Sequence, residues 1–271
     1  ENKRICIITK SAADESDSFL AQGGICMLRG EEDYEDYFED TMRAGHYENN
    51  EKTVDLMIRS SNSVIRDLLR MGVRFEREDD GSLAFTKEGA HSQPRILFHE
   101  DVTGREITST LLERAKEKEN IEIYEYVTML DIICDNNVCG GLVVADADKN
   151  ISCIKTDNVV WACGGIGGIY KNSTNFAHIT GDAIAIAINN GVEVQNLNYV
   201  QIHPTTLYEE NANRKFLISE SVRGEGAILL NKKGERFVDE LLPRDVVTEE
   251  IRKQMEIDAM KANEQVIEKY K

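Results

Sequence analysis

Short apolar runs typical of strands alternate with amphipathic helical patterns along most of the chain. Residues 5–9 form an isoleucine-rich run, and residues 159–162 form another that leads into the glycine-rich segment 163–168. Between these runs, apolar residues recur at helical spacing over 53–71 and 103–115. Because strands that alternate with helices pack as layers around a sheet, this order predicts an α/β fold.

The remaining pattern predicts further elements and one domain boundary. We expect helices over 31–42, 180–190 and 246–270, β structure over 121–134, 138–145 and 151–155, and a short strand at 73–75. Gly72 follows a helical pattern, where glycine commonly ends a helix. The character of the sequence changes near Asn196, so we expect one domain over 1–196 and a second over 197–271.

Composition limits the kinds of partner. The 271 residues carry a net charge of -17, with 41% apolar and 30% charged residues. A protein that binds nucleic acid needs a basic face, so nucleic acid is not an expected partner. The sequence has no long apolar run and no signal peptide, so we expect a cytoplasmic protein that does not bind membranes.

The cysteines do not follow a metal-binding pattern. Six cysteines are scattered along the chain, and none forms a C-x-x-C pair. The spacing of Cys134 and Cys139 is loose for zinc, and no matching second pair follows. We therefore expect buried free thiols and no metal site.

Three short motifs in the second half of the chain gather a histidine and two arginines. They are Gln201-Ile202-His203-Pro204-Thr205, Arg223-Gly224-Glu225-Gly226 and Pro243-Arg244-Asp245. Guanidinium groups grip carboxylates through paired, charge-assisted hydrogen bonds. These motifs therefore suit a small dicarboxylate ligand.

An earlier motif, Ser18-Phe19-Leu20-Ala21-Gln22-Gly23-Gly24-Ile25, follows the first expected strand. In this order, the motifs resemble the succinate dehydrogenase/fumarate reductase flavoprotein superfamily, and among its members the L-aspartate oxidases most. The resemblance extends over roughly residues 1–255. It implies a partial FAD-binding, Rossmann-like domain over 1–196 and an incomplete α+β capping domain over 197–271.

One family feature is not found in the sequence. The family opens with a glycine-rich turn that holds the FAD pyrophosphate at a helix N-terminus. No G-x-G-x-x-G lies near Glu1, and residues 5–9 match the family's second strand. We therefore expect this chain to be an internal portion of a longer enzyme.

The resemblance implies FAD as a non-covalent cofactor. The loop expected to wrap the flavin consists of Asp17, Ser18, Phe19, Leu20, Ala21, Gln22, Gly23 and Gly24. Respiratory members carry a flavin-linked histidine at the position of Asp17, so dissociable FAD is expected here. Lys10 matches a position near the adenosine ribose, where its backbone is expected to act because lysine cannot accept a hydrogen bond. Asp182, in Thr180-Gly181-Asp182, matches a residue that contacts FAD.

The substrate residues also follow from the resemblance. Glu88, in Lys87-Glu88-Gly89-Ala90-His91-Ser92, matches the glutamate that faces the substrate's α-amino group in L-aspartate oxidases. Dicarboxylate dehydrogenases lack this carboxylate because their substrate has no ammonium group, and an unpaired anion would repel it. His203 matches the histidine that binds a substrate carboxylate, and Gln201 belongs to the same motif.

Further along the chain, Ser219 and Glu220 match a substrate-contacting hydroxyl and carboxylate. The family often has threonine at the first of these positions, and serine keeps the hydroxyl. Arg244 matches the residue that shuttles a proton during catalysis. The alternative role of Arg244 is a purely electrostatic clamp on a substrate carboxylate, since the high pKa of arginine makes it an unusual base.

The resemblance implies oxidation of L-aspartate to iminoaspartate by FAD, with electrons passed to oxygen or fumarate. The product would serve quinolinate and NAD biosynthesis, with quinolinate synthase as the downstream partner. One alternative is a fumarate reductase or succinate dehydrogenase flavoprotein subunit. The other is an inactive, truncated fragment of such an enzyme.

Overall fold

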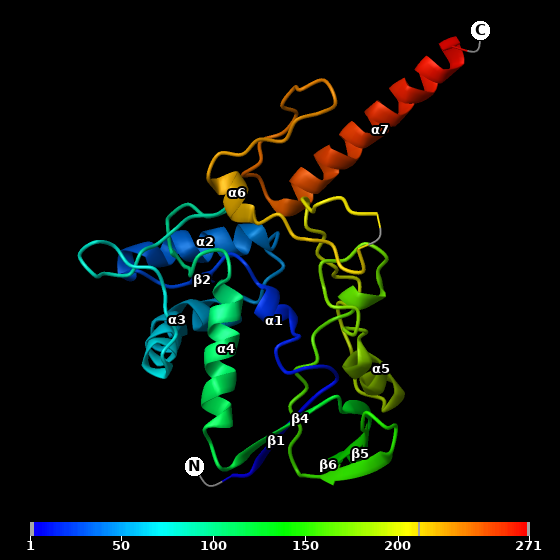
Figure 1. Ribbon diagram of the computed structural model, residues 1–271. Coiled ribbons are helices and arrows are strands. Elements are labelled where there is room, and N and C mark those ends of the chain that lie inside the picture. Colours follow the sequence, from blue (N-terminus) through cyan, green and yellow to red (C-terminus); the bar gives the residue numbers. More distant parts are fainter. Residues whose placement is uncertain (1–2, 211, 270–271) are drawn as a thin grey trace. The chain divides into compact units, whose positions relative to one another are not determined.

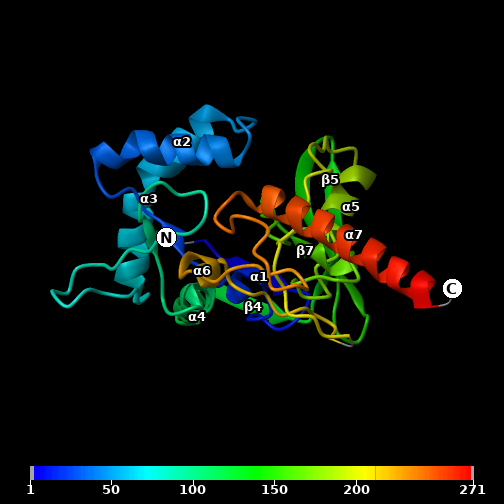
Figure 2. The ribbon, with the colours of Figure 1, turned by 90° about the horizontal axis from the view of Figure 1, so that it is seen from above.

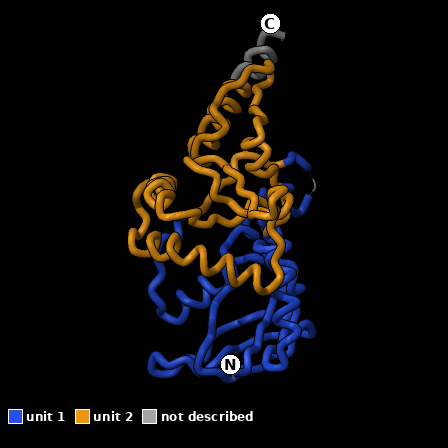
Figure 3. The backbone as a smooth tube through the Cα atoms, turned by 90° about the vertical axis from the view of Figure 1, so that its left-hand side faces the viewer, with its two compact units in different colours: residues 1–21, 104–199, 207–216 blue, residues 22–103, 200–206, 217–271 orange. Residues whose placement is uncertain are grey.

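Two compact units make up the part of the chain that the structure describes. The computed structural model describes residues 3–210 and 212–269, with side chains through residue 259 (Figure 1). Unit 1 comprises residues 1–21, 104–199 and 207–216, and unit 2 comprises residues 22–103, 200–206 and 217–271 (Figure 3). The domain boundary expected near Asn196 stays a prediction.

Unit 1 contains a parallel pair of strands. β1 (Ile5–Thr9) pairs with β4 (Ile121–Glu125), and Ile5 lies opposite Ile121. Parallel strands need a crossover connection, and α4 (Thr103–Lys116) comes directly before β4 in the chain (Figure 1). The expected first strand and the expected helix before β4 are confirmed.

A second sheet of unit 1 is antiparallel. It contains β5 (Thr128–Asp135), β6 (Val138–Ala145) and β7 (Ile151–Lys155) in that order. Asn136 and Asn137 have φ angles of 49° and 62°, which suit a two-residue hairpin turn between β5 and β6. Asparagine tolerates this left-handed conformation better than most residues, so the turn follows from the local sequence.

The single β segment expected over 121–134 is wrong, because it is two strands in two different sheets. β4 ends at Glu125, and β5 begins at Thr128. Tyr126, which lies between them, has a φ of 59°. A left-handed residue turns the backbone out of a straight strand. The sequence pattern did not reveal this turn because tyrosine is itself common in strands.

The apolar run 159–162 does not form the buried strand that its sequence predicts. This segment is irregular, and Val160 is 89% exposed. A strand is stabilised by hydrogen bonds to a neighbouring strand. Among the described residues, β1 pairs with β4 alone and no strand pairs with 159–162. The run therefore lacks the neighbour that its composition suits.

A short helix completes the regular structure of unit 1. α5 (Asp182–Asn189) confirms the helix expected over 180–190, and it packs against β5 (Figure 2). Its buried residues are Ile186 and Ala187. Gly191 follows with a φ of 70°, a conformation that ends helices and favours glycine.

Two packed helices form the core of unit 2. α2 (Tyr34–Ala44) continues from the short 3₁₀ helix η1 (Glu31–Asp33) and contacts α3 (Glu51–Met71) (Figures 1 and 2). The buried apolar cluster consists of Leu28, Tyr37, Met42, Val54 and Ile58. Burial of one large apolar side chain stabilises a fold by about 1.5–3 kcal/mol. Both helices were expected from sequence and are confirmed.

The ends of α3 follow local sequence signals. At its start, Asn50 Oδ1 accepts a hydrogen bond from the backbone N–H of Thr53 at 3.1 Å. At its end, Gly72 takes a φ of 103° and caps the helix. The end expected at Gly72 is therefore confirmed.

Unit 2 also contains a small antiparallel pair, β2 (Ile25–Cys26) and β3 (Ile96–Leu97). The strand expected at 73–75 is wrong. Val73 and Phe75 are buried, but the segment forms no ladder with a described strand. Their apolar character reflects burial in the core, which sequence alone does not distinguish from strand formation.

Two helices follow in the last third of the chain. α6 (Glu220–Gly224) is short. α7 (Arg244–Lys269) confirms the helix expected over 246–270 as far as Lys269, and residue 270 lies outside the described residues. Val247, in the first turn of α7, is fully buried. Among the described helices, none is long and apolar enough to cross a membrane.

The cysteines are free thiols, but the expectation that they are buried is wrong. Cys6, Cys134, Cys153 and Cys163 are exposed, and Cys26 and Cys139 are half-buried. Several of these residues lie on strands whose faces are partly open to solvent. The exposure of a strand face depends on what packs over it, and the sequence of the strand does not determine that.

Candidate functional site

Unit 2 brings together five polar residues from four separate segments, which we call the acid–arginine cluster. Its members are Glu88, Gln201, Glu220, Ser221 and Arg244. Arg244 is the first residue of α7, and its Nε donates to Glu220 Oε2 at 2.6 Å. Its Nη1 donates to Gln201 Oε1 at 2.9 Å. Two acceptors therefore fix the direction of this guanidinium group.

Glu220 is positioned by the start of α6. Ser219 caps this helix, because its Oγ accepts from the backbone N–H of Ser221 at 3.3 Å. The Glu220 side chain is 9% exposed, compared with 36% for Arg244. A Cβ placed on Gly89 would lie 2.6 Å from Glu220 Oε1, so glycine at this position leaves room for the carboxylate. Glu220 is therefore a nearly buried carboxylate with a charged partner.

Glu88 is the second carboxylate of the cluster, and it has weaker support. Ser221 Oγ donates to Glu88 Oε1 at 3.3 Å. Burial raises the pKa of Glu88, and the nearby charge of Glu220 raises it further. A Cβ on Gly23 would lie 2.7 Å from Glu88 Oε1, so this glycine also leaves room for a carboxylate. A cation that reached Glu88 would relieve this unfavourable environment.

His203 belongs to the same unit and is neutral. Burial lowers the pKa of His203, and the positive charge of Arg244 lowers it further. Its Nδ1 lies 3.0 Å from the backbone oxygen of Thr205 and 3.3 Å from the backbone nitrogen of the same residue. In the tautomer in which Nδ1 accepts from the N–H of Thr205, Nε2 carries the ring proton and can donate it to a ligand. A neutral imidazole can still share a hydrogen bond with a carboxylate ligand. The charge that would attract such a ligand therefore comes from arginine.

Four of the five cluster members are among the site residues predicted from sequence, and Ser221 is not. Ser221 bonds to Glu88, while the Ser219 hydroxyl caps α6 and donates to Ser221 Oγ at 3.1 Å. The only sequence signal was a second hydroxyl directly after Glu220. Substrate contact by Ser219 stays a prediction.

A separate polar cluster in unit 1 joins two motifs that lie far apart in sequence. Lys10 Nζ donates to Thr180 Oγ1 and to Asp182 Oδ2, at 2.8 Å each. Thr180 Oγ1 donates to Asp182 Oδ1 at 2.6 Å. Burial acts to raise the pKa of Asp182, but the hydrogen bonds from Lys10 and Thr180 outweigh it and hold the pKa below its usual range. The Lys10 side chain is thus already hydrogen-bonded within the protein. Its backbone is left for the predicted contact near the adenosine ribose.

The predicted flavin loop is held at both of its ends. In unit 1, Asp17 accepts from the backbone N–H of Phe176 at 3.1 Å and from the side chain of Asn175. In unit 2, Gln22 Nε2 donates to the backbone oxygen of Leu217 at 3.2 Å. The segment Asp17–Leu20 forms α1, a single helical turn that sequence analysis described as a loop. Its Ser16 cap supplies the reason, since serine at this position satisfies the first N–H groups of a helix.

The rest of this segment packs closely against backbone. The N–H of Gly104 donates to the backbone oxygen of Ala21 at 2.9 Å. A Cβ on Gly104 would lie 2.2 Å from the backbone oxygen of Ser18. In unit 2, a Cβ on Gly24 would lie 2.2 Å from the backbone oxygen of Leu97. Only glycine allows approaches of this kind.

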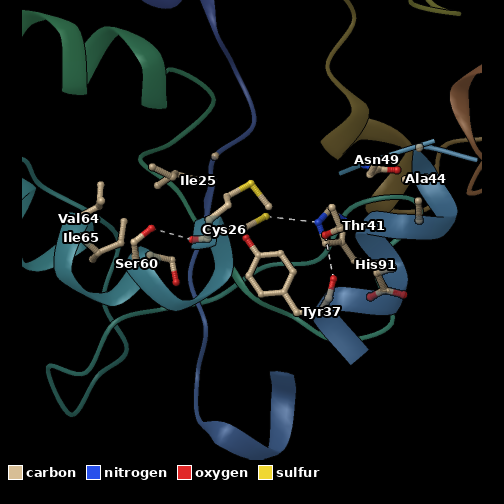
Figure 4. Close-up of a pocket in the computed structure, with 16 residues that line it drawn as sticks. Ile25, Cys26, Tyr37, Thr41, Ala44, Asn49, Ser60, Val64, Ile65 and His91 are labelled. Carbon is tan, nitrogen blue, oxygen red and sulfur yellow. Dashed lines mark hydrogen bonds between the residues drawn. The ribbon is translucent and has the colours of Figure 1, made fainter. Parts of the chain in front are cut away.

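Unit 2 also contains a cavity of about 690 Å³ between α2, α3 and the segment that contains β2 (Figure 4). His91 Nδ1 lies 3.1 Å from the backbone oxygen of Gly89, and its Nε2 lies 3.4 Å from Cys26 Sγ. Because a carbonyl only accepts, Nδ1 carries the proton and Nε2 accepts from the thiol. Burial raises the pKa of the Cys26 thiol, so this cysteine is not an activated nucleophile.

Comparison with known proteins identifies the family. A family model described as an FAD binding domain matches residues 1–267. The chain belongs to the FAD binding domain family. FAD is therefore its cofactor, as predicted from sequence.

The relatives of this FAD binding domain confirm the predicted resemblance. L-aspartate oxidase of Clostridium perfringens is 46% identical over 94% of the chain, and that of Clostridium acetobutylicum is 45% identical over 95%. The chain spans 58% and 59% of the length of these two relatives. A solved quinol fumarate reductase of E. coli superposes with a TM-score of 0.87 at 28% identity, covering 94% of this chain and 46% of that one. The predicted α/β fold and superfamily are confirmed.

The described residues fit the cofactor in each unit. In unit 2, Gln22 Oε1 is buried and has no hydrogen-bond partner among the described residues, so it can accept from a ligand. In unit 1, the same holds for the donor Trp161 Nε1. A Cβ on Gly165 would meet nothing within 4 Å, so backbone there is open to approach. Orphaned polar atoms and open glycine backbone suit a large polar ligand such as FAD.

Proposed function

We propose that this chain forms the FAD-binding and substrate-binding part of an L-aspartate oxidase, which oxidises L-aspartate to iminoaspartate. The observation that carries the proposal is Glu88, a carboxylate of raised pKa in the same cluster as Arg244. An amino acid with two carboxylates and one ammonium group matches a site with both signs of charge. The similarity to L-aspartate oxidases supports the same substrate.

In this proposal, His203 and three residues of the acid–arginine cluster divide the binding of the substrate. Glu88 binds the substrate ammonium group, because it is the carboxylate without a strong cationic partner. Arg244 and the neutral His203 bind substrate carboxylate oxygens as hydrogen-bond donors. Gln201 holds the guanidinium group of Arg244 in one direction.

Arg244 and Glu220 together support proton transfer. FAD, when bound, supplies the chemistry that accepts a hydride from the substrate carbon. As Arg244 takes a proton from the substrate, its own Nε proton passes to Glu220 Oε2, 2.6 Å away. Arginine then keeps its charge throughout, and the proton ends on the Glu220 carboxylate. The clamp role of Arg244 is compatible with the same contacts.

The cofactor contacts support dissociable FAD. Asp17 stands where respiratory members of the superfamily carry a flavin-linked histidine, and a carboxylate cannot form that linkage. Its oxygens already accept from Asn175 and Phe176. In the proposal, Lys10, Asp182 and the loop residues Asp17, Ser18, Phe19, Leu20, Ala21, Gln22, Gly23 and Gly24 hold FAD.

The wider role of the protein follows from this activity. We propose that the electrons pass to oxygen or to fumarate, and that the product serves quinolinate and NAD biosynthesis in the cytoplasm, with quinolinate synthase as the consumer. The second candidate is a dicarboxylate oxidoreductase, which the fold similarity to fumarate reductase favours. Glu88 opposes that candidate because it would repel a dianion that lacks an ammonium group.

The test is a visible absorption spectrum of the purified protein with added FAD, before and after L-aspartate or succinate is added without oxygen. A flavin band that bleaches with L-aspartate and not with succinate is the expected result. Bleaching with succinate alone would select the dicarboxylate candidate. Failure to take up FAD would identify the chain as an inactive fragment.

A further inference from the structure

The loop that carries Glu88 is closed at its base by a backbone bridge. Thr86 and Ile96 exchange two backbone hydrogen bonds, of 2.9 Å and 3.1 Å. Within the loop, Ala90 has a φ of 65°, a conformation that L-residues other than glycine rarely adopt. A loop with such a residue keeps its shape only when other contacts hold it.

Asp40, on α2, supplies those contacts. Its Oδ2 accepts from the backbone N–H and from the Oγ of Ser92, at 2.6 Å each. The same oxygen accepts from Arg95 Nη1 at 2.6 Å. Burial acts to raise the pKa of Asp40, but the hydrogen bonds from Ser92 and Arg95 outweigh it and keep the pKa below its usual range. Asp40 is therefore an ionised carboxylate that is only 5% exposed and is bound to the loop.

Arg95 connects this contact to the helical core. Its side chain is fully buried, and its Nη2 and Nε donate to the two oxygens of Asp33 at 2.7 Å and 3.3 Å. Asp33 lies directly before α2, the helix that carries Asp40. Both acids are thus tied to one packed helix, and the guanidinium group between them has no freedom to follow the loop.

None of these bonds reaches the Glu88 carboxylate, whose Oε1 accepts from Ser221. A Cβ on Gly23 would come within 2.7 Å of Oε1, so the Glu88 carboxylate occupies space that this glycine leaves free. The position of the carboxylate in that space is set by the backbone of the loop.

From these contacts we propose that Asp40 is a positioning residue: through Ser92 and Arg95 it holds the loop so that Glu88 selects a ligand that carries an ammonium group. The proposal rests on the proposed function of Glu88. It adds a network on α2 that controls specificity without touching the substrate. Its loss would reduce discrimination between L-aspartate and succinate, which a purely stabilising role would leave unchanged.

The test uses FAD-loaded protein without oxygen. The dependence of the flavin reduction rate on L-aspartate concentration gives one dissociation constant, and the shift of the flavin spectrum on titration with succinate gives the other. The dissociation constant for succinate divided by that for L-aspartate measures discrimination, so a high ratio means preference for L-aspartate. Ser92→Ala removes one hydroxyl bond, and Asp40→Asn removes the charge. Each is expected to lower the ratio by about ten- to a hundred-fold, the effect of a small misplacement in a preorganised site. Ser92→Thr keeps the hydroxyl and should keep the ratio.

The matched control is Asp36→Asn, the same change one turn earlier on α2. Asp36 is exposed and accepts from Gln93 of the same loop at 3.4 Å. The ratio of dissociation constants in the Asp36→Asn variant should equal that of the wild type. Thermal unfolding of every variant shows whether a loss of discrimination is caused by a loss of fold. If Asp40→Asn does not fold, Ser92→Ala still tests the proposal.

Two results would overturn the proposal, and they differ. Wild-type protein that binds succinate as well as L-aspartate would remove the proposed function and the positioning role with it. Wild-type protein that discriminates, with Glu88→Gln losing the discrimination but Ser92→Ala and Asp40→Asn keeping it, would leave the proposed function intact and reject the role of Asp40.

Discussion

The Nε atom of Arg244 lies 2.6 Å from Oε2 of Glu220. This contact distinguishes the two carboxylates of the acid–arginine cluster. Glu220 has a guanidinium partner, whereas Glu88 accepts from the hydroxyl of Ser221. The difference supports the two roles in the proposal, in which Glu220 accepts a proton and Glu88 binds the ammonium group of the ligand.

The first prediction concerns Arg244. Arg244→Lys keeps the charge but cannot donate to Glu220 and Gln201 with one planar group. We expect the rate of flavin reduction by L-aspartate to fall by about 10²–10⁴-fold, the usual effect of losing a positioned proton-transfer group. Anaerobic stopped-flow absorbance measures this rate. Arg252→Lys is the control, because Arg252 lies on the same helix and pairs with Glu249 and Glu256 on the surface. Equal rates in both variants would contradict the role of Arg244.

The second prediction concerns the pH dependence of ligand binding through Glu88. Burial and the charge of Glu220 raise the pKa of Glu88, so it loses its charge at higher pH than an ordinary glutamate. L-aspartate affinity should therefore fall as the pH drops through this raised pKa. Isothermal titration at several pH values checks the trend, and Glu88→Gln should abolish this part of it. An unchanged pH profile in the variant would rule out Glu88 as the ammonium ligand.

The third prediction concerns the effect of Glu88 on the pH dependence of the free energy of unfolding. A carboxyl whose pKa is raised by folding stabilises the folded state below its unfolded pKa, which is about 4.3 for glutamate. That contribution is lost as the pH rises through the folded pKa. The free energy of unfolding of Glu88→Gln should thus increase relative to wild type as the pH rises through this window. Urea denaturation at a series of pH values tests the sign, and a difference that shrinks with rising pH would contradict it.

The fourth prediction concerns Lys10 and Asp182 in unit 1. Lys10→Met leaves Asp182 without its cation and frees the side chains that the lysine joins. The pair is about one-third exposed, so FAD affinity should fall by only about two- to five-fold. Titration of flavin fluorescence measures this affinity. Arg4→Met removes an ion pair with Glu122 on the surface and should leave FAD binding unchanged. A matching loss in both variants would indicate a general effect of charge.

The fifth prediction concerns the start of α3. Asn50→Ala removes the cap on the N–H of Thr53 and should lower the free energy of unfolding by about 1 kcal/mol. Asn50→Asp keeps an acceptor and should unfold like the wild type. Chemical denaturation of the three proteins decides this, and equal stability of the alanine variant would mean that the cap contributes nothing.

Local sequence determined the elements that depend on neighbouring residues. The helix from Glu51 to Met71 is one example, because its cap at Asn50 and its end at Gly72 lie within the same segment. The motif that contains Glu88 and the motif that contains Arg244 were also found from their own residues, through resemblance to a family. These features depend on residue type and short spacing, which a sequence displays directly.

Tertiary structure alone decided which distant residues meet. Val160 suits a strand, yet it is exposed because no described strand lies beside it. The bond from Ser221 to Glu88 and the tie from Asp40 to Ser92 join segments whose proximity no local pattern encodes. Hydrogen bonds and burial depend on which residues are neighbours in space. Residues that are distant in sequence become neighbours only when the whole chain packs.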